Sequence, residues 1–387
     1  MTSQTILIIG SGVMGASVAY HLALRGYRNV TVLEREPSSG LGSTGKATGG
    51  FRSQFGTEVN VRLSLLARQK LLNFKEELGV DPGYRQCGYL LLTNNESQLK
   101  ELRAAQQIQH IAGLHEASEV SIDDALKLNP AINPKGLIGG VFCPTDGFIR
   151  PLEILRGYTE ASKRLGVRFL YGEEVTGFEM GDERKIVAVK TKSGELAADV
   201  FINAAGAWAG TLARMADVNL PVVPLRRQVA VTHSFTRLPE DMPMTIFCED
   251  GFHLRVRDGR VLLLMPSDRY PAQPFDFSFA SGWVDQVVER ARQCIPVLRD
   301  AKIDTEQCHA GLYEMSPDKH AILGHSAEVE NFYLINGSSG HGVMHAPALG
   351  QLLAEILVDG QTTSLDVSAL RHKRFRENKL NLVMEFL

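Results

Sequence analysis

The spacing of apolar residues predicts a strand, a helix and a second strand at the start of the chain. An apolar run over residues 5–9 is typical of a buried strand. Apolar residues then recur at helical spacing from Ala16 to Ala23, and Gly26 suits the end of that helix. Residues 29–33 form the next β-branched, apolar run. The pattern therefore predicts a βαβ unit with two neighbouring parallel strands.

Similar patterns return in two later parts of the chain. They predict helices over about 58–78, 151–165 and 349–357, and strands over about 167–170, 174–175, 199–203 and 332–336. Between these parts, residues 229–232, 253–257 and 261–265 alternate as antiparallel strands do, with a turn at Asp258-Gly259. We expect an α/β fold with an inserted antiparallel sheet.

The first strand breaks directly into Gly10-x-Gly12-x-x-Gly15 at the start of the first helix. In this motif Gly10 permits a tight turn, Gly12 lets a pyrophosphate approach the backbone, and Gly15 lets the helix pack on the strand. Glu34 ends the second strand at about the spacing of a carboxylate that binds a ribose. This unit predicts a dinucleotide site formed by Gly10, Ser11, Gly12, Val13, Met14, Gly15, Glu34 and Arg35.

Composition narrows the class of protein. The 387 residues are 44% hydrophobic and 22% charged, which suits a globular enzyme with two domains. A net charge of −3 argues against a nucleic-acid partner, and no apolar run is long enough for a transmembrane segment. Because the first strand leaves no room for a signal peptide, we expect a cytoplasmic location. The five cysteines and eleven histidines show no ligand spacing, so we expect no metal.

Five motifs in the same order resemble the superfamily of glycine oxidase, sarcosine oxidase and D-amino acid oxidase, which are FAD-dependent oxidoreductases. Within it the chain is most similar to the β-subunits of sarcosine oxidase and of dye-linked L-proline dehydrogenase. The motifs are Gly10–Gly15 with Glu34, the loop Gly42–Arg52, Asn203–Trp208, Tyr313–His320, and Gly340–Gly342 at the start of the last helix.

The resemblance implies a Rossmann-like FAD-binding domain and a substrate domain. We expect residues 1–82, 150–215 and 311–387 in the first and residues 83–149 and 216–310 in the second. The further FAD-binding residues that it implies are Gly42, Ser43, Thr44, Lys46, Thr48, Gly49, Gly50, Val175, Ala204, Ala205, Gly206, Trp208, Gly311, Gly337, Gly340, His341, Gly342, Val343 and Met344. Simpler alternatives are close helix packing for Ala204–Ala207 and an ordinary core strand for Val175.

Arg52 matches the arginine that binds the substrate carboxylate in sarcosine oxidases, and a surface salt bridge is its alternative. Arg255 is the second candidate, unless its strand face is solvated. His341 is expected to bond the cofactor or to be a core histidine. Lys46 is expected to approach the flavin ring or phosphate, or to point to water. The helix start at Gly342 would stabilise negative charge on the ring, unless it only closes the domain.

The chain departs from the family pattern at several positions. Thr44 and Gly45 replace histidines, and Gly311 replaces the cysteine that tethers the flavin in monomeric sarcosine oxidases, so we expect non-covalent FAD. Met344 replaces a second carboxylate-binding lysine. Leu263 aligns loosely with the lysine that activates O2, which favours a dehydrogenase that passes electrons to a partner or a quinone.

The resemblance implies oxidation of a small secondary amine or amino acid, of the sarcosine, proline or glycine type, by hydride transfer to flavin N5 to give an imine. A first alternative is a 2-hydroxy acid dehydrogenase with His253 or His341 as base. A second is a flavin-carrying subunit that is active only in a hetero-oligomer. The basic stretch Arg371–Arg376 is expected either to dock an acidic partner or membrane surface, or to be solvated.

Overall fold

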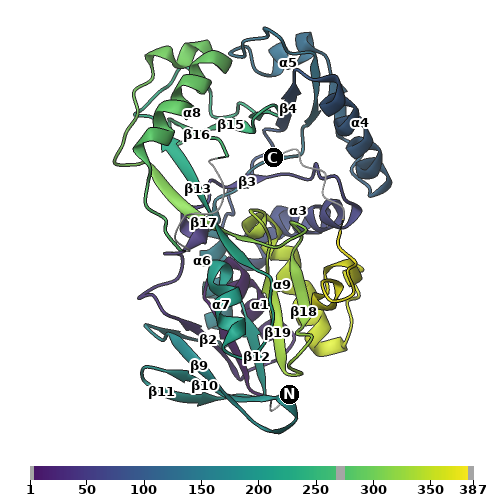
Figure 1. Ribbon diagram of the computed structural model, residues 1–387, viewed down its shortest axis with the longest axis vertical. Helices are drawn as coiled ribbons and strands as arrows, with labels where there is room; N and C mark the ends of the chain where they lie inside the picture. Colours follow the sequence, from purple (N-terminus) through teal and green to yellow (C-terminus); the bar gives the residue numbers. More distant parts are fainter. Residues whose placement is uncertain (1–3, 267–274, 382–387) are drawn as a thin grey trace.

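The computed structural model describes residues 4–266 and 275–381. Two main sheets organise this part of the chain, one of six strands and one of eight. In Figure 1 the six-stranded sheet lies in the lower half of the view, and strands β4, β15 and β16 of the larger sheet lie in the upper half.

The six-stranded sheet is parallel except at one edge, where β18 runs antiparallel to β19. Its strands, in spatial order, are β18 (Ile322–His325), β19 (Phe332–Asn336), β12 (Val200–Asn203), β1 (Ile6–Ile9), β2 (Val30–Glu34) and β8 (Arg168–Tyr171). The predicted βαβ unit is therefore confirmed, with β1 between β12 and β2 at the centre.

Alternate residues of β1 enter two different cores, because successive side chains of a strand point to opposite faces. Ile6 and Ile8 pack among helices, whereas Leu7 and Ile9 pack toward a three-stranded sheet on the other face. The helices on the first face are α1 (Val13–Leu24), α3 (Glu58–Leu78), α6 (Pro151–Arg164) and α9 (Gly342–Asp359). The other face carries α7 (Ala209–Arg214), β9 (Val175–Met180), β10 (Ile186–Thr191) and β11 (Gly194–Ala197).

The eight-stranded sheet is antiparallel apart from the pair β14 and β4, which is parallel and was not predicted. In spatial order it contains β17 (His309–Met315), β13 (Val223–Val231), β16 (Arg260–Leu264), β15 (Phe252–Arg257), β14 (Met244–Phe247), β4 (Tyr89–Thr93), β6 (Gly139–Cys143) and β5 (Ser118–Val120). Helix α8 (Ser281–Cys294) packs on one face through Trp283 and Val287.

The remaining elements are short or peripheral. They are α2 (Ser43–Lys46), α4 (Glu96–Ile111), α5 (Ile122–Leu128), β3 (Gly50–Phe51), β7 (Gly147–Phe148) and five 3-10 turns at Asp182–Arg184, Gly206–Trp208, Pro296–Asp300, Ser368–Leu370 and His372–Arg374. The helix predicted over 58–78 is confirmed residue for residue. The glycine-rich loop after residue 40 differs from expectation because α2 forms one helical turn inside it.

Strand β17 spans Gly311, where one domain boundary is predicted, and pairs along its length with β13. The strand that begins the last predicted part of the FAD-binding domain thus belongs to the eight-stranded sheet. The division into domains stays a prediction.

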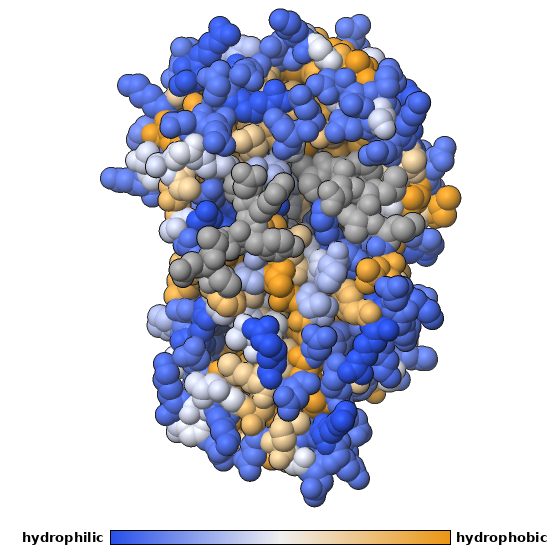
Figure 2. Space-filling view, viewed as in Figure 1, coloured by the Kyte–Doolittle hydropathy of each residue, from blue (hydrophilic) through white to orange (hydrophobic). Residues whose placement is uncertain are grey.

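Hydrophilic residues cover most of the face shown in Figure 2, with smaller groups of hydrophobic residues between them. Exposed large hydrophobic side chains are spread over distant positions, such as Leu24, Leu72, Ile111 and Leu152. In residues 4–266 and 275–381, none of the helices combines the length and the apolar character that crossing a membrane requires.

Candidate functional site

One cavity of about 350 Å³ connects the ends of strands β1, β2 and β12 with the start of helix α9. The eight-stranded sheet closes it through Val229 of β13 and Leu264 of β16. The sequence-predicted residues that line it are Gly10, Gly12, Val13, Met14, Glu34, Arg35, Gly42, Ser43, Thr44, Lys46, Thr48, Gly49, Gly50, Val175, Ala204, Ala205, Gly206, Trp208, Gly311, Gly340, Gly342, Val343 and Met344. Four others, Ser11, Gly15, Gly337 and His341, are not among the lining residues.

The glycine turn after β1 leaves no room for side chains at two of its positions. A Cβ atom at Gly10 would lie 2.4 Å from the carbonyl oxygen of Ala204, and one at Gly15 would lie 2.0 Å from that of Gly10. Gly10 also has a φ of +107°, which disfavours any other residue. At Gly12 the nearest atom to an added Cβ is Thr44 Oγ1, at 3.4 Å. The turn therefore brings bare backbone to the cavity at the start of α1.

The carboxylate of Glu34 is held in place at the end of β2 by three hydrogen bonds. Its Oε2 accepts from the backbone N–H of Ser11 at 3.0 Å and from the Ser11 hydroxyl at 2.8 Å. Its Oε1 accepts from the backbone N–H of Glu36 at 3.1 Å. Ser11 thus fixes the orientation of Glu34, the residue predicted to bind the ribose.

Arg35 and Trp208 form a stack on the same side of the cavity. The guanidinium carbon of Arg35 lies 3.8 Å from the centroid of the Trp208 ring, whose other contact is a parallel stack with Phe275 at 5.4 Å. Such cation–π contacts fix two flexible side chains against each other. Glu173 and Glu174, which were not predicted, also line the cavity beside Val175.

The opposite end of the cavity is formed by the turn that starts α9. Gly340 has a φ of +93°, and a Cβ atom there would lie 2.5 Å from the Tyr313 ring. Helix α9 begins at Gly342 without a side-chain cap, so its first N–H groups and its partial positive charge face this end. Lys46 reaches the same cavity with its ammonium 3.8 Å from the centroid of the Phe277 ring, and burial lowers its pKa.

Arg52 lies beside this end as a buried cation. Its backbone N–H donates to Sδ of Met344, which lines the cavity. Arg52 is 8% exposed and is not itself among the lining residues. Among the described residues no carboxylate forms an ion pair with it, although the charge of the nearby Asp146 favours its charged form. The guanidinium contacts two acceptors, the Gln54 carbonyl at 3.4 Å and His341 Nε2 at 3.1 Å, and lies 4.4 Å from the Phe55 ring centroid. Burial lowers its pKa, but an arginine stays charged.

His341 accepts the hydrogen bond from Arg52, because a guanidinium has only donors. Burial, and then the charge of Arg52, hold the pKa of His341 well below its usual range. The ring is therefore neutral and carries its proton on Nδ1. We expected His341 either to bond the cofactor or to be a core histidine. The geometry favours neither of these roles and instead indicates that His341 positions Arg52.

Asp146 holds the segment that follows Arg52. Its Oδ1 accepts from the backbone N–H of Ser53 at 2.6 Å, and its Oδ2 accepts from Gln54 Nε2 at 3.0 Å. The carboxyl is buried, and burial raises its pKa to about 6, so it is ionised at neutral pH.

We expect Asp146→Ala to raise KM for a carboxylate substrate about tenfold while kcat and FAD content change little. The two orphaned donors would cost on the order of 1–3 kcal/mol and release the backbone next to Arg52. Steady-state kinetics with a flavin absorbance measurement checks this. Asp146→Asn, which keeps an acceptor for Ser53, should recover most of the loss, and equal KM values for alanine and wild type would refute the role.

Arg255 does not reach the cavity. Its Nη1 donates to the carbonyl oxygens of Thr48 at 2.7 Å and Gly49 at 2.9 Å, and its guanidinium carbon lies 3.7 Å from the Phe148 ring centroid. In place of the predicted contact with substrate, this geometry favours a role in holding the cavity wall. Strand alternation buries Leu263 in the core under α8 and directs Leu264 to the cavity, and the match of Leu263 to an oxygen-activating lysine stays a prediction.

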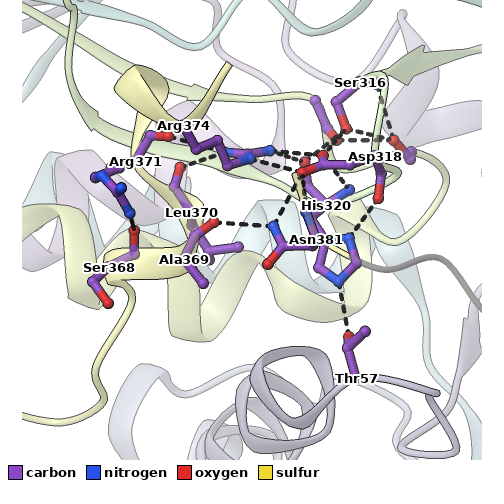
Figure 3. Close-up of polar contacts among 12 residues, drawn as sticks. Thr57, Ser316, Asp318, His320, Ser368, Ala369, Leu370, Arg371, Arg374 and Asn381 are labelled. Carbon is purple, nitrogen blue, oxygen red and sulfur yellow. Dashed lines mark hydrogen bonds and ion pairs between the residues drawn. The ribbon is translucent and has the colours of Figure 1, made fainter. Parts of the chain in front are cut away.

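The basic stretch near the C-terminus contains both buried and exposed cations, with Arg374 buried and Lys373 and Arg376 exposed. Arg374 is fully buried and makes two hydrogen bonds to Asp318, at 2.8 and 2.9 Å, as Figure 3 shows. Burial raises the pKa of Asp318, but the hydrogen bonds and charge of Arg374 outweigh this and lower it to about 2. Arg376 pairs with Glu328 at 2.5 Å. Arg374 therefore stabilises the fold, and docking of a partner or membrane surface by the exposed cations stays a prediction.

The Arg374–Asp318 pair also connects to the cavity wall. His320 accepts a hydrogen bond on Nε2 from the Thr57 hydroxyl at 2.8 Å, just before α3, and its carbonyl accepts from Ser316 Oγ at 2.7 Å (Figure 3). The backbone N–H of Ser316 in turn donates to Ser339 Oγ at 3.1 Å, in the turn that precedes α9. The C-terminal segment thus supports the turn at Gly340.

Several cavity residues were missed in the sequence, and most had no local signal. Tyr313 and Glu314 lie within the motif Tyr313–His320, which carries part of the family resemblance, so that motif is the signal for them. Arg227, Val229 and Leu264 come from the eight-stranded sheet, and only its register against the glycine turn brings them to the cavity.

The family model described as FAD dependent oxidoreductase matches residues 5–356 of the chain. The chain therefore belongs to this family and is an FAD-dependent oxidoreductase. Among curated relatives, it is 28% identical to FAD-dependent oxidoreductase domain-containing protein 1 of Xenopus laevis and 27% identical to mitochondrial sarcosine dehydrogenase of Mus musculus. Each match covers 96% of the chain. The chain spans 82% of the first relative but only 42% of the second.

Among solved structures, the fold is similar to that of L-proline dehydrogenase from P. horikoshii, with a TM-score of 0.90 and 28% identity over 98% of this chain and 99% of that one. Glycine oxidase from Geobacillus kaustophilus has the same fold, with a TM-score of 0.83 and 23% identity over 95% of this chain and 98% of that one. The predicted fold class and the family resemblance are confirmed.

The cavity fits the cofactor of the family. Backbone without side chains at Gly10 and Gly12 leaves space for a diphosphate at the start of α1. Glu34, at one end, offers carboxylate acceptors to ribose hydroxyls, and Gly342, at the other, offers helix N–H groups to an electron-rich ring. Since Gly311 has no side chain and Ser43 and Thr44 carry hydroxyls, none of these positions offers a thiol or imidazole for a covalent link.

Proposed function

We propose that the protein oxidises a small secondary amine or amino acid, of the sarcosine, proline or glycine type, to the corresponding imine. The observation that carries the proposal is Arg52, a buried guanidinium next to Met344 of the cavity lining, with no ion-paired carboxylate among the described residues. The charge of the nearby Asp146 acts on Arg52 without an ion pair, so a bidentate substrate carboxylate would be a better partner for this buried cation. The names of similar proteins, which include sarcosine dehydrogenase and L-proline dehydrogenase, support the same substrate class.

Bound FAD supplies the acceptor for a hydride from the carbon next to nitrogen. In the proposed mechanism Arg52 fixes the carboxylate end of the substrate, and neutral His341 keeps the guanidinium in place. Val229 and Leu264 exclude water from the opposite wall. The uncapped N-terminus of α9 stabilises negative charge that develops at its end of the cavity.

The 2-hydroxy acid alternative needs a base for the hydroxyl proton, and both candidate histidines are poor bases here. Burial lowers the pKa of His253 to about 4, and its Nδ1 donates to the Gly251 carbonyl at 2.8 Å. The Nε2 lone pair of His341 is already used by Arg52. The geometry therefore favours an amine, which needs no hydroxyl base.

We further propose non-covalent FAD and transfer of electrons to an acceptor other than O2. Leu263, which we match to the oxygen-activating lysine of sarcosine oxidases, is apolar, and so is Leu264, which lines the cavity from the same strand. Without that cation, reaction with O2 is expected to be slow.

Anaerobic mixing of the FAD-loaded protein with sarcosine, proline, glycine and a 2-hydroxy acid tests the proposal. We expect an amine to bleach the flavin absorbance, the hydroxy acid to leave it, and the colour to return slowly in air. Bleaching by the hydroxy acid alone would overturn the substrate class, and rapid recovery in air would overturn the dehydrogenase assignment. A protein that binds FAD but is reduced by none of the amines would favour a subunit that needs a partner chain.

A further inference from the structure

Glu314 brings a carboxyl group to the end of the cavity where α9 begins. Its Oε1 accepts from the backbone N–H of Ser338 at 3.3 Å and lies 3.7 Å from the position of a Cβ at Gly342. Its Oε2 is closed to water and has no hydrogen-bond partner in the described part of the chain. A buried carboxylate oxygen without a hydrogen-bond donor is unusual in folded proteins, and such atoms often have a functional role.

Among the residues that the structure describes, no cation forms an ion pair with Glu314. The titratable side chains on the elements packed against it are Lys46, Arg226, Arg227, His309, Tyr313 and His341, and Arg52 lies beside the same end of the cavity. None of them forms an ion pair with Glu314 among the described residues: Arg226 bonds to Asp276 and Ser278, and the Arg227 guanidinium lies over the Tyr313 ring. Burial raises the pKa of Glu314 to about 7, although hydrogen bonds from Ser338 and Gly337 oppose the rise.

Two negative charges at this end of the cavity would repel each other. The helix N-terminus and the Ser338 N–H favour one negative charge, which the Glu314 carboxylate supplies while the cofactor is oxidised. Transfer of a hydride adds two electrons but only one proton, so the reduced cofactor gains a negative charge. A like charge nearby raises the pKa of a carboxyl group and drives proton uptake.

We propose that Glu314 takes up one proton from solvent when the bound FAD is reduced and releases it when the FAD is reoxidised. The substrate C–H bond would give its electron pair and its proton to the cofactor, and Glu314 would take a second proton from solvent. On reoxidation the acceptor would remove two electrons, and both protons, one from the cofactor and one from Glu314, would leave to the acceptor or to solvent. The inference rests on the proposed placement of the ring at the α9 end of the cavity.

Potentiometric titration of the bound FAD with a chemical reductant between pH 6 and pH 9 tests this without any substrate. Above pH 7 the wild type should take up one more proton per two electrons than Glu314→Gln. Its equilibrium constant for FAD reduction should therefore fall tenfold more for each added pH unit than that of the variant. For a two-electron couple this difference corresponds to about 30 mV per pH unit. Glutamine keeps an acceptor for Ser338 and removes only the titrating group.

Glu174→Gln is a matched control, because Glu174 lines the other end of the same cavity and pairs with Lys192 at 3.0 Å. It should keep the wild-type slope. The wild type also gives a second readout that needs no variant, namely the protons taken up on photoreduction in dilute indicator dye. Equal slopes for wild type and Glu314→Gln, or uptake of only one proton per FAD above pH 7, would overturn the inference alone. A protein that takes up no FAD would instead overturn the cofactor placement and this inference together.

Discussion

Arg52→Met is expected to lower kcat/KM for an amino-acid substrate by about 30-fold to about 5,000-fold. Removing one partner of a buried, hydrogen-bonded charge pair typically costs about 2–5 kcal/mol, and the lost interaction leaves the substrate carboxylate in an apolar pocket. Methionine fills a similar volume, so FAD content and folding should change little. Stopped-flow reduction of the bound flavin against substrate concentration measures the effect.

The size of the Arg52 effect depends on the substrate carrying a carboxylate. An amine of the same shape without that group should be oxidised equally slowly by the wild type and by Arg52→Met. Arg52→Lys keeps the charge but loses the planar fork, so it should recover only part of the activity. If Arg52→Met kept wild-type affinity for the amino acid, the carboxylate assignment would be wrong.

Arg374→Met is expected to lower the free energy of unfolding by about 3–5 kcal/mol. The change strands the Asp318 carboxylate, whose side chain is 1% exposed, without its buried counter-ion. Urea unfolding, followed by far-UV circular dichroism, measures the loss. Arg103→Met removes an ion pair to Glu119 in which both side chains are more than 40% exposed, and it should cost far less than Arg374→Met because solvent screens the pair.

A double variant distinguishes the effect of the Arg374–Asp318 charge pair on stability from the effect of side-chain packing. Asp318→Leu together with Arg374→Met removes both charges, so it should be more stable than Arg374→Met alone. Because the low pKa of Asp318 favours the ionised form in the folded state, its contribution is present above about pH 4 and is lost as the pH falls toward 2. A stability loss in Arg374→Met no larger than that in Arg103→Met would contradict the structural role.

The sequence predicted those parts of the site that depend on neighbouring residues. Gly10, Gly12 and Gly15 lie within one short turn of the chain. The motif alone therefore predicts where the backbone has no side chains beside the cavity. Glu34 ends the adjacent parallel strand, and its place follows from the βαβ unit. These features are local, and the structure has them where the pattern predicts.

Other parts depend on contacts between distant segments, which one sequence does not reveal. Strand alternation grouped Arg255 with its face of β15, but the partner carbonyls of Thr48 and Gly49 lie about two hundred residues earlier in the chain. The partner of Arg374, Asp318, lies 56 residues earlier, in the turn between β17 and β18. From the sequence alone, Arg255 therefore resembled a residue that binds substrate, although it holds the cavity wall. Arg374 likewise resembled part of a solvated basic patch, although it is buried.

The central claim is that Arg52 binds the carboxylate of an amine held beside FAD. The most direct measurement is the rate of anaerobic flavin bleaching with two matched pairs, proline against pyrrolidine and sarcosine against dimethylamine. The account predicts that at least one amino acid bleaches the flavin at least thirtyfold faster than its partner without the carboxylate. Equal rates within both pairs would contradict it.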